Sequence, residues 1–251
     1  MPNRRSVLVG SASMVLLCAA WELAARRGAL NPTMLPPPSL ILQTVWTLIT
    51  TGAFLKPLGE TLWMLLVGYS IACVVGIGLG LAMGVNVFVY GLLEPLVEAI
   101  RPVPKPALIP ALTIFLGLGA ALKITTVSMA AVFPILIGTL QGVRGVDPIA
   151  IATGKTLGCS RLQIILSVIL PSALPMILTG MRVSLGMGLA LVILAEMLSA
   201  ESGVGFLILD LQRSFQVRSM YAWIFILGAV GLLLNTLFER VEDVIVPWRA
   251  K

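Results

Sequence analysis

Residues 147–171 read DPIAIATGKTLGCSRLQIILSVILP, a comparatively polar stretch in an otherwise apolar chain. Asp147 is a favourable N-cap residue, and Pro148 suits the first position of a helix, where its missing N–H needs no partner. Gly158 follows about two and a half turns later and can adopt the left-handed conformation that ends many helices. This part of the stretch therefore predicts a short helix that ends at Gly158.

A second helix is predicted directly after this glycine. Ser160 and Gln163 have the S-x-x-Q spacing of a capping box, which marks the start of a helix. We expect this helix to run to Leu170, because Pro171 and Pro175 follow it. Two short helices joined at a glycine form a compact knob that can seat in a groove of another protein.

Gly154-Lys155-Thr156 resembles the end of a phosphate-binding loop, G-x-x-x-x-G-K-[ST]. The first glycine of that motif would fall at Ile149, and no strand precedes it. We therefore expect no ATP and no other cofactor on this chain, and any energy from ATP would come from a partner protein.

The composition of the chain is that of an integral membrane protein. Of its 251 residues, 58% are hydrophobic and 11% are charged, whereas about 25% of the residues of a soluble domain are charged. The chain has no histidine, which excludes His-dependent triads and His-ligated zinc or haem. The three cysteines, Cys18, Cys73 and Cys159, are far apart, so we expect neither a disulfide framework nor a metal site.

Six stretches are apolar and long enough, or nearly so, to cross a membrane, which takes about 20 residues. They are residues 7–25, 62–83, 107–122, 124–141, 174–199 and 221–238. The first could instead be a signal peptide, because Arg4 and Arg5 precede it, but its apolar run is longer than is usual for one. The sequence thus predicts an all-α membrane protein with about six transmembrane helices.

The formal charge of +6 raises the question of a nucleic-acid partner. Six crossings place both termini on one side, which then carries eleven Lys and Arg residues against six on the other side. Because basic residues favour cytoplasmic loops, we expect both termini in the cytoplasm and no nucleic-acid partner.

The whole chain, residues 1–251, is expected to form one transmembrane domain. Residues 1–59 would hold the first crossing and an external loop, and residues 60–251 would form the core that carries the knob. In the external loop three consecutive prolines precede Ser39. Ser39 is the predicted N-cap of a short helix at residues 40–49 that lies along the membrane interface.

Two of the expected crossings have faces of small residues, which let the backbone of another helix approach closely. These residues are Gly68, Ala72, Gly76, Gly80 and Gly84 in the second crossing and Gly180, Ser184 and Gly188 in the fifth. The two faces predict a tightly packed bundle and say nothing specific about function.

The third expected crossing is short and begins among prolines. Arg101-Pro102-Val103-Pro104-Lys105-Pro106 precedes it, and Pro110 lies just inside it. Broken helices at membrane depth often line solute routes in transporters, so Pro104, Pro106 and Pro110 are candidate pathway residues. The alternative is a rigid elbow that only redirects the chain.

Glu196 lies in an apolar run near the outer end of the fifth expected crossing. A carboxylate is costly there, which favours a role in the pathway. The alternative is that Glu196 reaches the membrane interface and is solvated by water.

Residues 152–171 resemble the EAA loop of bacterial ABC-importer permeases, whose pattern is E-A-A-x3-G-x9-I-x-L-P. Gly158 is followed by nine residues and then by Val168-Ile169-Leu170-Pro171, whereas Ala152-Thr153-Gly154 replaces Glu-Ala-Ala. The subgroup that imports nitrate, sulfonates and taurine also has similar segments elsewhere. These segments are LPPPS at 35–39, RPVP at 101–104, FPIL at 133–136, GVRGVDP at 142–148 and AEML at 195–198.

This resemblance implies a MetI-like fold and a transport subunit rather than an enzyme. Two copies, as a homodimer in the bacterial inner membrane, would form an alternating-access pathway for a small anion such as a sulfonate, taurine or nitrate. Two separate ATP-binding subunits would drive it, and a periplasmic or lipid-anchored binding protein would deliver the solute. The implied contacts of the knob with the ATPase are Ala152, Thr153, Gly154, Gly158 and Ser160.

Two other classes of function compete with this interpretation. An ATP-independent carrier or channel would be favoured by charge pairs inside the membrane or by an inverted repeat, and the sequence reveals neither. A membrane enzyme is disfavoured because the chain has no histidine and no cluster of Asp and Glu on a cytoplasmic loop.

Overall fold

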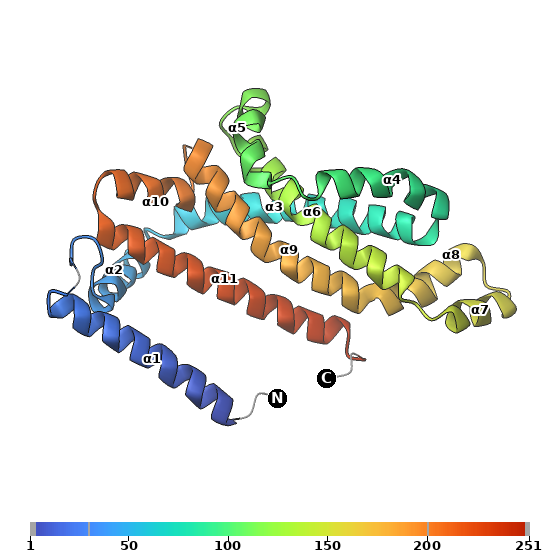
Figure 1. Ribbon diagram of the computed structural model, residues 1–251, viewed down its shortest axis with the longest axis horizontal. Coiled ribbons are helices and arrows are strands. Elements are labelled where there is room, and N and C mark those ends of the chain that lie inside the picture. Colours follow the sequence, from blue (N-terminus) through green and yellow to red (C-terminus); the bar gives the residue numbers. More distant parts are fainter. Residues whose placement is uncertain (1–3, 30, 200, 249–251) are drawn as a thin grey trace. The chain divides into compact units, whose positions relative to one another are not determined.

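A computed structural model describes residues 4–29, 31–199 and 201–248 of the chain, and these residues contain helices and no strand. This confirms the all-α fold predicted from the sequence. Figure 1 labels the helices, which are α1 (Arg4–Arg26), α2 (Pro38–Thr50), α3 (Leu55–Val85), α4 (Val87–Ile100), α5 (Lys105–Leu116), α6 (Ala120–Arg144), α7 (Pro148–Thr156), α8 (Arg161–Ile164), the π-helix η1 (Ile165–Ile169), α9 (Leu170–Ser199), α10 (Val204–Arg213) and α11 (Val217–Ile245).

By their internal contacts, these helices fall into two compact units. The first contains the chain up to Pro57 together with Leu207–Ala229, and the second contains Leu58–Phe206 together with Val230–Lys251. The knob and the core helices all lie in the second unit.

Four helical segments of the described chain are long and apolar enough to cross a membrane. They are Leu55–Val85, Ala120–Arg144, Arg161–Leu198 and Val217–Ile245. Each contains one of the expected crossings. The first expected crossing, residues 7–25, lies within the 23-residue helix α1, several of whose side chains are outside the described part.

The expected crossing at residues 107–122 is wrong in its bounds. α5 has only 12 residues and ends at Leu116, because Gly117 has a φ of 70° and breaks the helix. Residues 120–122 belong to the start of α6 instead. α4 and α5 are together apolar and long enough for a broken span or a re-entrant loop, and the two helices are bent by 95° at the proline elbow.

Two helices, α4 and α10, were not predicted from the sequence. α4 begins after Asn86, whose side chain accepts hydrogen bonds from the N–H groups of Phe88 and Val89. Asn before an apolar run is a recognised start signal. This start signal was not recognised in the sequence because Pro95 interrupts the apolar run. The helix nevertheless continues through this proline.

In the first unit, α2 begins at Pro38 rather than after Ser39, so the prediction of Ser39 as N-cap is wrong. The backbone N–H of Ser39 donates to Glu22 Oε2 at 3.0 Å, and its hydroxyl donates to Glu22 Oε1 at 2.8 Å. A carboxylate from α1 therefore supplies the acceptor that the first turn of α2 needs.

In the second unit, another helix lies against the small-residue face of α3, as predicted, and that helix is α6. A Cβ atom added to Gly68 would lie 2.7 Å from the carbonyl oxygen of Ile124, and one added to Gly80 would lie 2.6 Å from Thr139 Cβ. The same face meets Ile135 at Gly76 and Val143 at Gly84. The two backbones are thus as close as the missing side chains permit.

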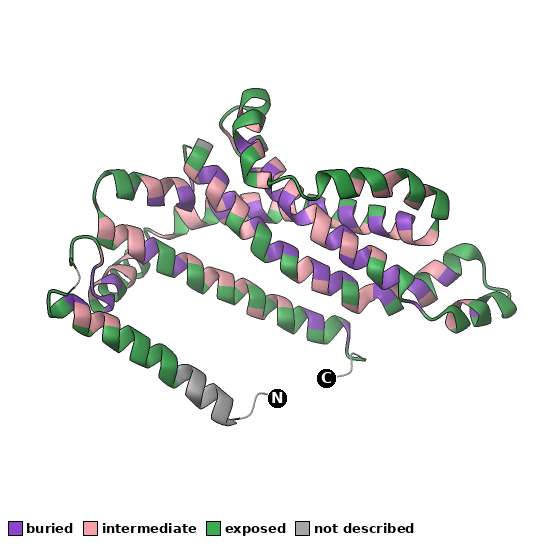
Figure 2. Ribbon diagram, in the orientation of Figure 1, coloured by how far each residue is buried: buried purple, intermediate pink, exposed green. Residues whose placement is uncertain are grey.

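α6 and α9 pack in the same way and run side by side in Figure 1. A Cβ atom on Gly138 would lie 2.8 Å from the carbonyl oxygen of Met176, and one on Gly142 would lie 2.7 Å from that of Ala173. On α9, Gly180 faces the carbonyl oxygen of Pro134. Buried residues accordingly follow α6 and α9, whereas α4 and α7 are mostly exposed or half-buried (Figure 2).

Replacing Gly80 by Ala is expected to destabilise the bundle, because the new methyl group has no space beside Thr139. Overpacking of this kind costs about 1–3 kcal/mol. Gly78 is the matched control, since it lies on the same helix with nothing within 4 Å of an added Cβ. Gly78→Ala should leave stability unchanged or raise it by about 0.5–1 kcal/mol. Thermal unfolding of the purified variants in detergent measures the difference, and equal effects at both positions would contradict the packing argument.

Candidate coupling knob and solute cavity

The first helix of the knob, α7, forms as predicted from the sequence. The side chain of Asp147 accepts a hydrogen bond from the N–H of Ile149 at 2.8 Å, and Pro148 occupies the first position of α7. Gly158 has a φ of 74°. The hydrogen bond of Asp147 defines the start of α7, and the left-handed Gly158 follows shortly after the end of this helix.

The end of α7 is a Schellman motif, the most specific of the glycine-based helix ends. The N–H of Cys159 donates to the carbonyl of Gly154 at 3.0 Å, and the N–H of Gly158 donates to that of Lys155 at 3.0 Å. Both bonds require the positive φ of Gly158. No atom outside its chain neighbours lies within 4 Å of a Cβ added there, so backbone conformation is the only constraint at this position.

The second helix starts with the predicted capping box. The N–H of Ser160 donates to Gln163 Oε1 at 2.7 Å, and the N–H of Gln163 donates to Ser160 Oγ at 3.3 Å. The two caps fix both helices of the knob and the turn between them.

The predicted end of the second helix at Leu170 is wrong. α8 passes through the π-helix η1 directly into α9, so that Arg161–Leu198 is a single apolar segment. In η1 the N–H of Leu170 donates to the carbonyl of Ile165, five residues earlier. This wider turn lies just before Pro171, whose ring and missing N–H disfavour a regular α-helical turn there. The knob is therefore continuous with α9.

Four of the five candidate contact residues of the knob are exposed. Gly154 is the exception: it is buried, and a Cβ added there would lie 3.3 Å from Ile164 Cγ1. This glycine lets α7 lie close to α8. The exposed candidates are Ala152, Thr153, Gly158 and Ser160. Among the apolar neighbours of these residues, Ile149, Leu157 and Leu162 are 72%, 76% and 65% exposed.

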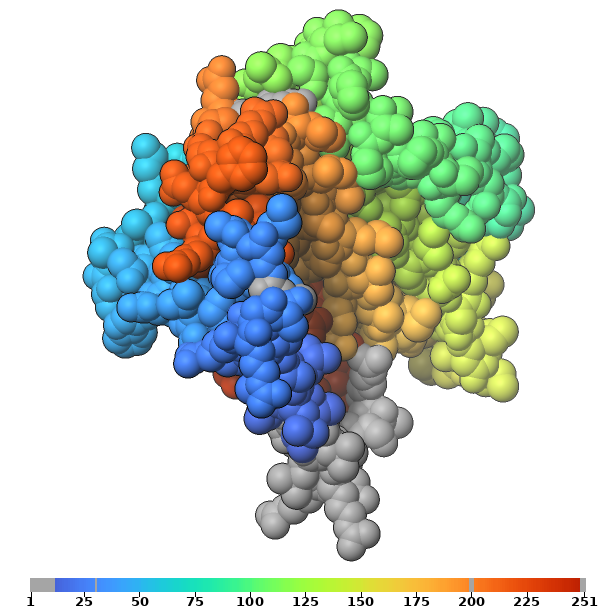
Figure 3. Space-filling model, turned by 60° about the vertical axis from the view of Figure 1, so that its left-hand side comes forward, coloured from blue at the N-terminus to red at the C-terminus, as the bar shows by residue number. Residues whose placement is uncertain are grey.

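A cavity of about 530 Å³ lies in the second unit, open to one side. One wall is a face of α6 and another is a face of α9, each with helical spacing, and the elbow between α4 and α5 forms the third. Figure 3 shows two of the segments that line the cavity, the green α4–α5 segment and the light-orange α9. Along α9 the cavity extends from Met176 to Leu191, which is about 22 Å at 1.5 Å per residue. That length is most of the thickness of a bilayer core of about 30 Å.

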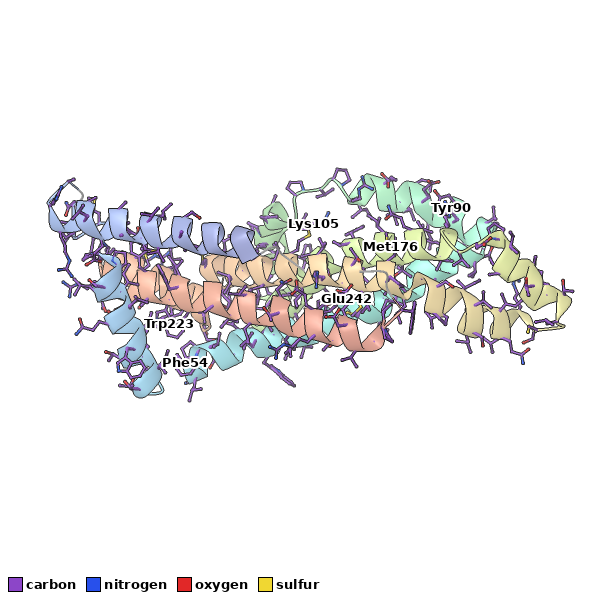
Figure 4. The ribbon with its side chains drawn as sticks, turned by 90° about the horizontal axis from the view of Figure 1, so that it is seen from below. Phe54, Tyr90, Lys105, Met176, Trp223 and Glu242 are labelled. Carbon is purple, nitrogen blue, oxygen red and sulfur yellow. The ribbon has the colours of Figure 1, made fainter. Side chains whose placement is uncertain are left out.

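Lys105 holds the proline elbow together. Its ammonium group donates to the carbonyl oxygens of Ile100, Arg101 and Val103 at 3.0, 2.7 and 2.8 Å. It also lies 4.7 Å from the centre of the Phe133 ring. The carbonyl of Ile100 also accepts from the N–H of Val103 at 3.2 Å. One side chain therefore binds three carbonyls at the end of α4 and in the elbow. Figure 4 labels Lys105 at the start of α5 and Met176 on α9.

None of the four predicted pathway residues is on the wall of this cavity. Pro104 is the N-cap residue of α5, Pro106 lies in its first turn, and Pro110 lies inside it. All three are exposed. They shape the elbow, whereas Arg101, just before the prolines, and Val103 and Lys105, between them, line the cavity.

Glu196 has no exposed surface, so the alternative that water solvates it is wrong. The Thr61 hydroxyl lies 2.9 Å from its Oε2, and the N–H of Gly205 donates to the same atom at 2.9 Å. Lys123 Nζ lies 3.5 Å from its Oε1 and donates to the Ser202 carbonyl at 2.7 Å. The N–H of Gly205 is in the first turn of α10, so the carboxylate of Glu196 stabilises the start of that helix.

A second ion pair joins α9 to α11. Arg182 Nη2 lies 3.2 Å from Glu239 Oε1 and 3.1 Å from Glu242 Oε2, and Glu242 is 4% exposed. Sequence reasoning missed both this pair and that of Lys123 with Glu196, because the partners are more than 50 residues apart and no local pattern connects them.

The chain matches the family model described as "binding-protein-dependent transport system inner membrane component" over residues 74–251. It belongs to this family of permeases. The match includes the knob and the cavity helices, and the fold is accordingly that of a multi-pass membrane protein.

Full-length relatives agree with this assignment. The permease is 31% identical to the taurine transport system permease protein TauC of Escherichia coli, over 100% of this chain and 93% of that one. It is 31% identical to the putative aliphatic sulfonates transport permease protein SsuC of Bacillus subtilis, over 93% and 85%. It is 29% identical to the nitrate import permease protein NrtB of Synechocystis, over 98% and 91%.

Solved structures support the fold. The MetNI methionine ABC transporter matches with a TM-score of 0.66 and 19% identity, covering 84% of this chain and 98% of that one. The prediction of a MetI-like fold is thereby confirmed.

Replacing Lys123 by Met should strongly destabilise the permease, because Glu196 would stay buried without its cation. Breaking a buried pair in this way costs about 3–5 kcal/mol. Adding Glu196→Gln to the Lys123→Met variant should restore part of the loss, since the amide carries no charge. Thermal unfolding in detergent measures both variants. Lys56→Met is the control, because Lys56 is exposed, and a Lys123→Met variant as stable as this control would refute the role of the pair.

Proposed function

We propose that this permease is the transmembrane subunit of an ATP-driven importer for a small anion that a solute-binding protein delivers. The observation that carries the proposal is the knob, two capped helices joined at Gly158 and continuous with α9. α9 in turn forms a wall of the cavity. One helical segment thus connects a surface suited to a partner with the candidate route of the solute.

In this proposal, the ATP-binding subunit binds the exposed face of the knob, at Ala152, Thr153, Gly158 and Ser160. Gly154 acts inside the knob by keeping α7 close to α8. The apolar side chains of Ile149, Leu157 and Leu162 widen this face, and their burial would provide affinity.

The cycle would proceed by alternating access. ATP binding would bring two ATPases together and move the two knobs with them, and α9 would transmit that displacement to the cavity. The π-helix η1 interrupts the regular α-helical hydrogen bonding between the knob and the membrane segment, so any bending would concentrate there. Hydrolysis in the partner would reset the cycle, so no nucleotide and no catalytic residue is required on this chain.

The partners follow from this cycle. A second copy of the permease would cover the open side of the cavity, giving a homodimer with two ATP-binding subunits and one periplasmic or lipid-anchored binding protein. The knob would face the cytoplasm, with both termini on the same side, as the distribution of basic residues favours.

The rival interpretation, an ATP-independent carrier, would require charge pairs along the solute route. Among the residues that the structure describes, Lys123 with Glu196 and Arg182 with Glu242 are buried or half-buried ion pairs. None of these four residues lines the cavity. They join helices to one another, which is a structural role and gives the rival no support.

Gly158→Leu is expected to leave insertion and folding largely intact and to uncouple ATP hydrolysis from transport. Leucine has space at this position but adopts a φ of 74° only with strain. Gly158→Asn is the matched control, because asparagine tolerates the left-handed conformation, and it should keep most of the transport. The measurements are membrane level, solute uptake and ATPase activity. Normal uptake by Gly158→Leu would disprove the role of this turn.

The proposal as a whole is tested by affinity purification of the tagged chain from its native membrane, followed by mass spectrometry. We expect an ATP-binding subunit in near-equal amount. Reproducible recovery of the chain alone, in several mild detergents, would refute an ATP-driven importer and favour a self-sufficient carrier or channel.

A further inference from the structure

The cavity has an uneven distribution of charge. Two cationic residues, Arg101 and Lys105, lie on its elbow wall, and no Asp or Glu is among the described residues that line it. The nearby Glu98 pairs with Arg101 Nη1 at 2.9 Å, but both side chains are about half exposed. A half-exposed pair is weak, so the elbow wall remains electropositive.

The two cations differ in the hydrogen bonds that they can still make. Lys105 uses its three donors on three backbone carbonyls, so it contributes positive charge and no direct bond to a ligand. Arg101 has five N–H donors, and Glu98 engages only Nη1. The remaining donors form the planar fork that binds oxyanions in bidentate fashion.

The opposite wall is apolar. Met176, Val183, Met187 and Leu191 present side chains from one face of α9. The Thr179 hydroxyl, on the same face, donates to the carbonyl of Pro175 and is therefore already engaged. A bare inorganic anion would leave this wall in contact with water, whereas an anion with a short aliphatic body would cover it.

We propose that Arg101 is the direct ligand of an amphipathic organic anion in this cavity. The anion has a compact oxyanion head bound at the elbow and a short aliphatic body against Met187 and Leu191 of α9. This inference rests on the proposed function, in which the cavity is the solute route. A cavity of this kind would bind alkanesulfonate-like solutes in preference to nitrate-like ones.

The charge of the cavity can be measured without transport, by the reaction of a cysteine introduced at Val183, which is 50% exposed on the cavity wall. The full-length chain, purified in a non-ionic detergent, first has its three native cysteines replaced by Ser or Ala. The thiolate attacks a methanethiosulfonate, forming a disulfide and releasing methanesulfinate. Two reagents are compared, the anionic 2-sulfonatoethyl and the cationic 2-(trimethylammonium)ethyl derivative, and each rate is divided by that with free 2-mercaptoethanol.

We expect the normalised rate of the anionic reagent to exceed that of the cationic reagent about tenfold. Arg101→Gln should bring the ratio close to one. Arg240→Gln is the matched control, since Arg240 is exposed on α11 and does not line the cavity, and it should keep the ratio. A ratio near one in the parent protein, or one that Arg101→Gln does not change, would overturn the proposal.

The preference for an aliphatic body is tested by protection. Butanesulfonate and nitrate are added separately, and labelling of the Val183→Cys protein by an uncharged methanethiosulfonate is followed. Half-protection should need at least about tenfold less butanesulfonate than nitrate. Equal protection by the two anions, or none by butanesulfonate, would overturn this part of the inference.

These outcomes separate the inference from the proposed function. Recovery of an ATP-binding partner together with an uncharged cavity would refute only the role of Arg101. An anion-selective cavity in a chain that has no ATP-binding partner would refute only the ATP-driven importer.

Discussion

The close approach of α6 to α3 on one side and to α9 on the other is the constraint on which the structure depends. Glycine makes it possible, because Gly68, Gly80, Gly138 and Gly142 lie where any side chain would collide with the neighbouring helix. In a membrane, where lipid is as apolar as the helices, such contact is a main source of association between them. With α6 and α9 held this tightly, their adjoining faces form two fixed walls of the cavity, and the elbow provides the third.

The side chain of Lys105 compensates for backbone hydrogen bonds that the prolines of the elbow prevent. Prolines prevent a regular helix between α4 and α5 and leave carbonyls without N–H partners, which is costly in a membrane unless another donor takes their place. Lys105 donates to three carbonyls at the elbow, of which that of Ile100 also accepts from the N–H of Val103, and it adds a positive charge beside the cavity. The two interpretations that the sequence left open, a rigid elbow and a solute route, are therefore compatible. The prolines set the bend, and Arg101 and Lys105, which are next to them in the sequence, line the cavity.

Transmission from the knob to the cavity depends on the continuity of α8, η1 and α9. A break at Pro171 would have separated the two, and the widened turn of the π-helix keeps them joined while it accommodates the proline. The buried pair of Lys123 with Glu196 acts at the opposite end of α9, where it fixes the corner that leads into α10. The end of α9 that leads into α10 is thus fixed by specific polar contacts.

Features that depend on neighbours along the chain could be predicted from the amino-acid sequence. The N-cap at Asp147, the left-handed Gly158, the capping box of Ser160 with Gln163 and the small-residue faces could all be predicted, because each needs only a local spacing. Which distant side chains meet depends on how the helices pack and could not be predicted in this way. The bond of Ser39 to Glu22, the pairing of Lys123 with Glu196 and the cavity position of Arg101 have no local signal. A charged residue placed in an apolar run indicates that a partner is needed, but only the packing of helices selects that partner.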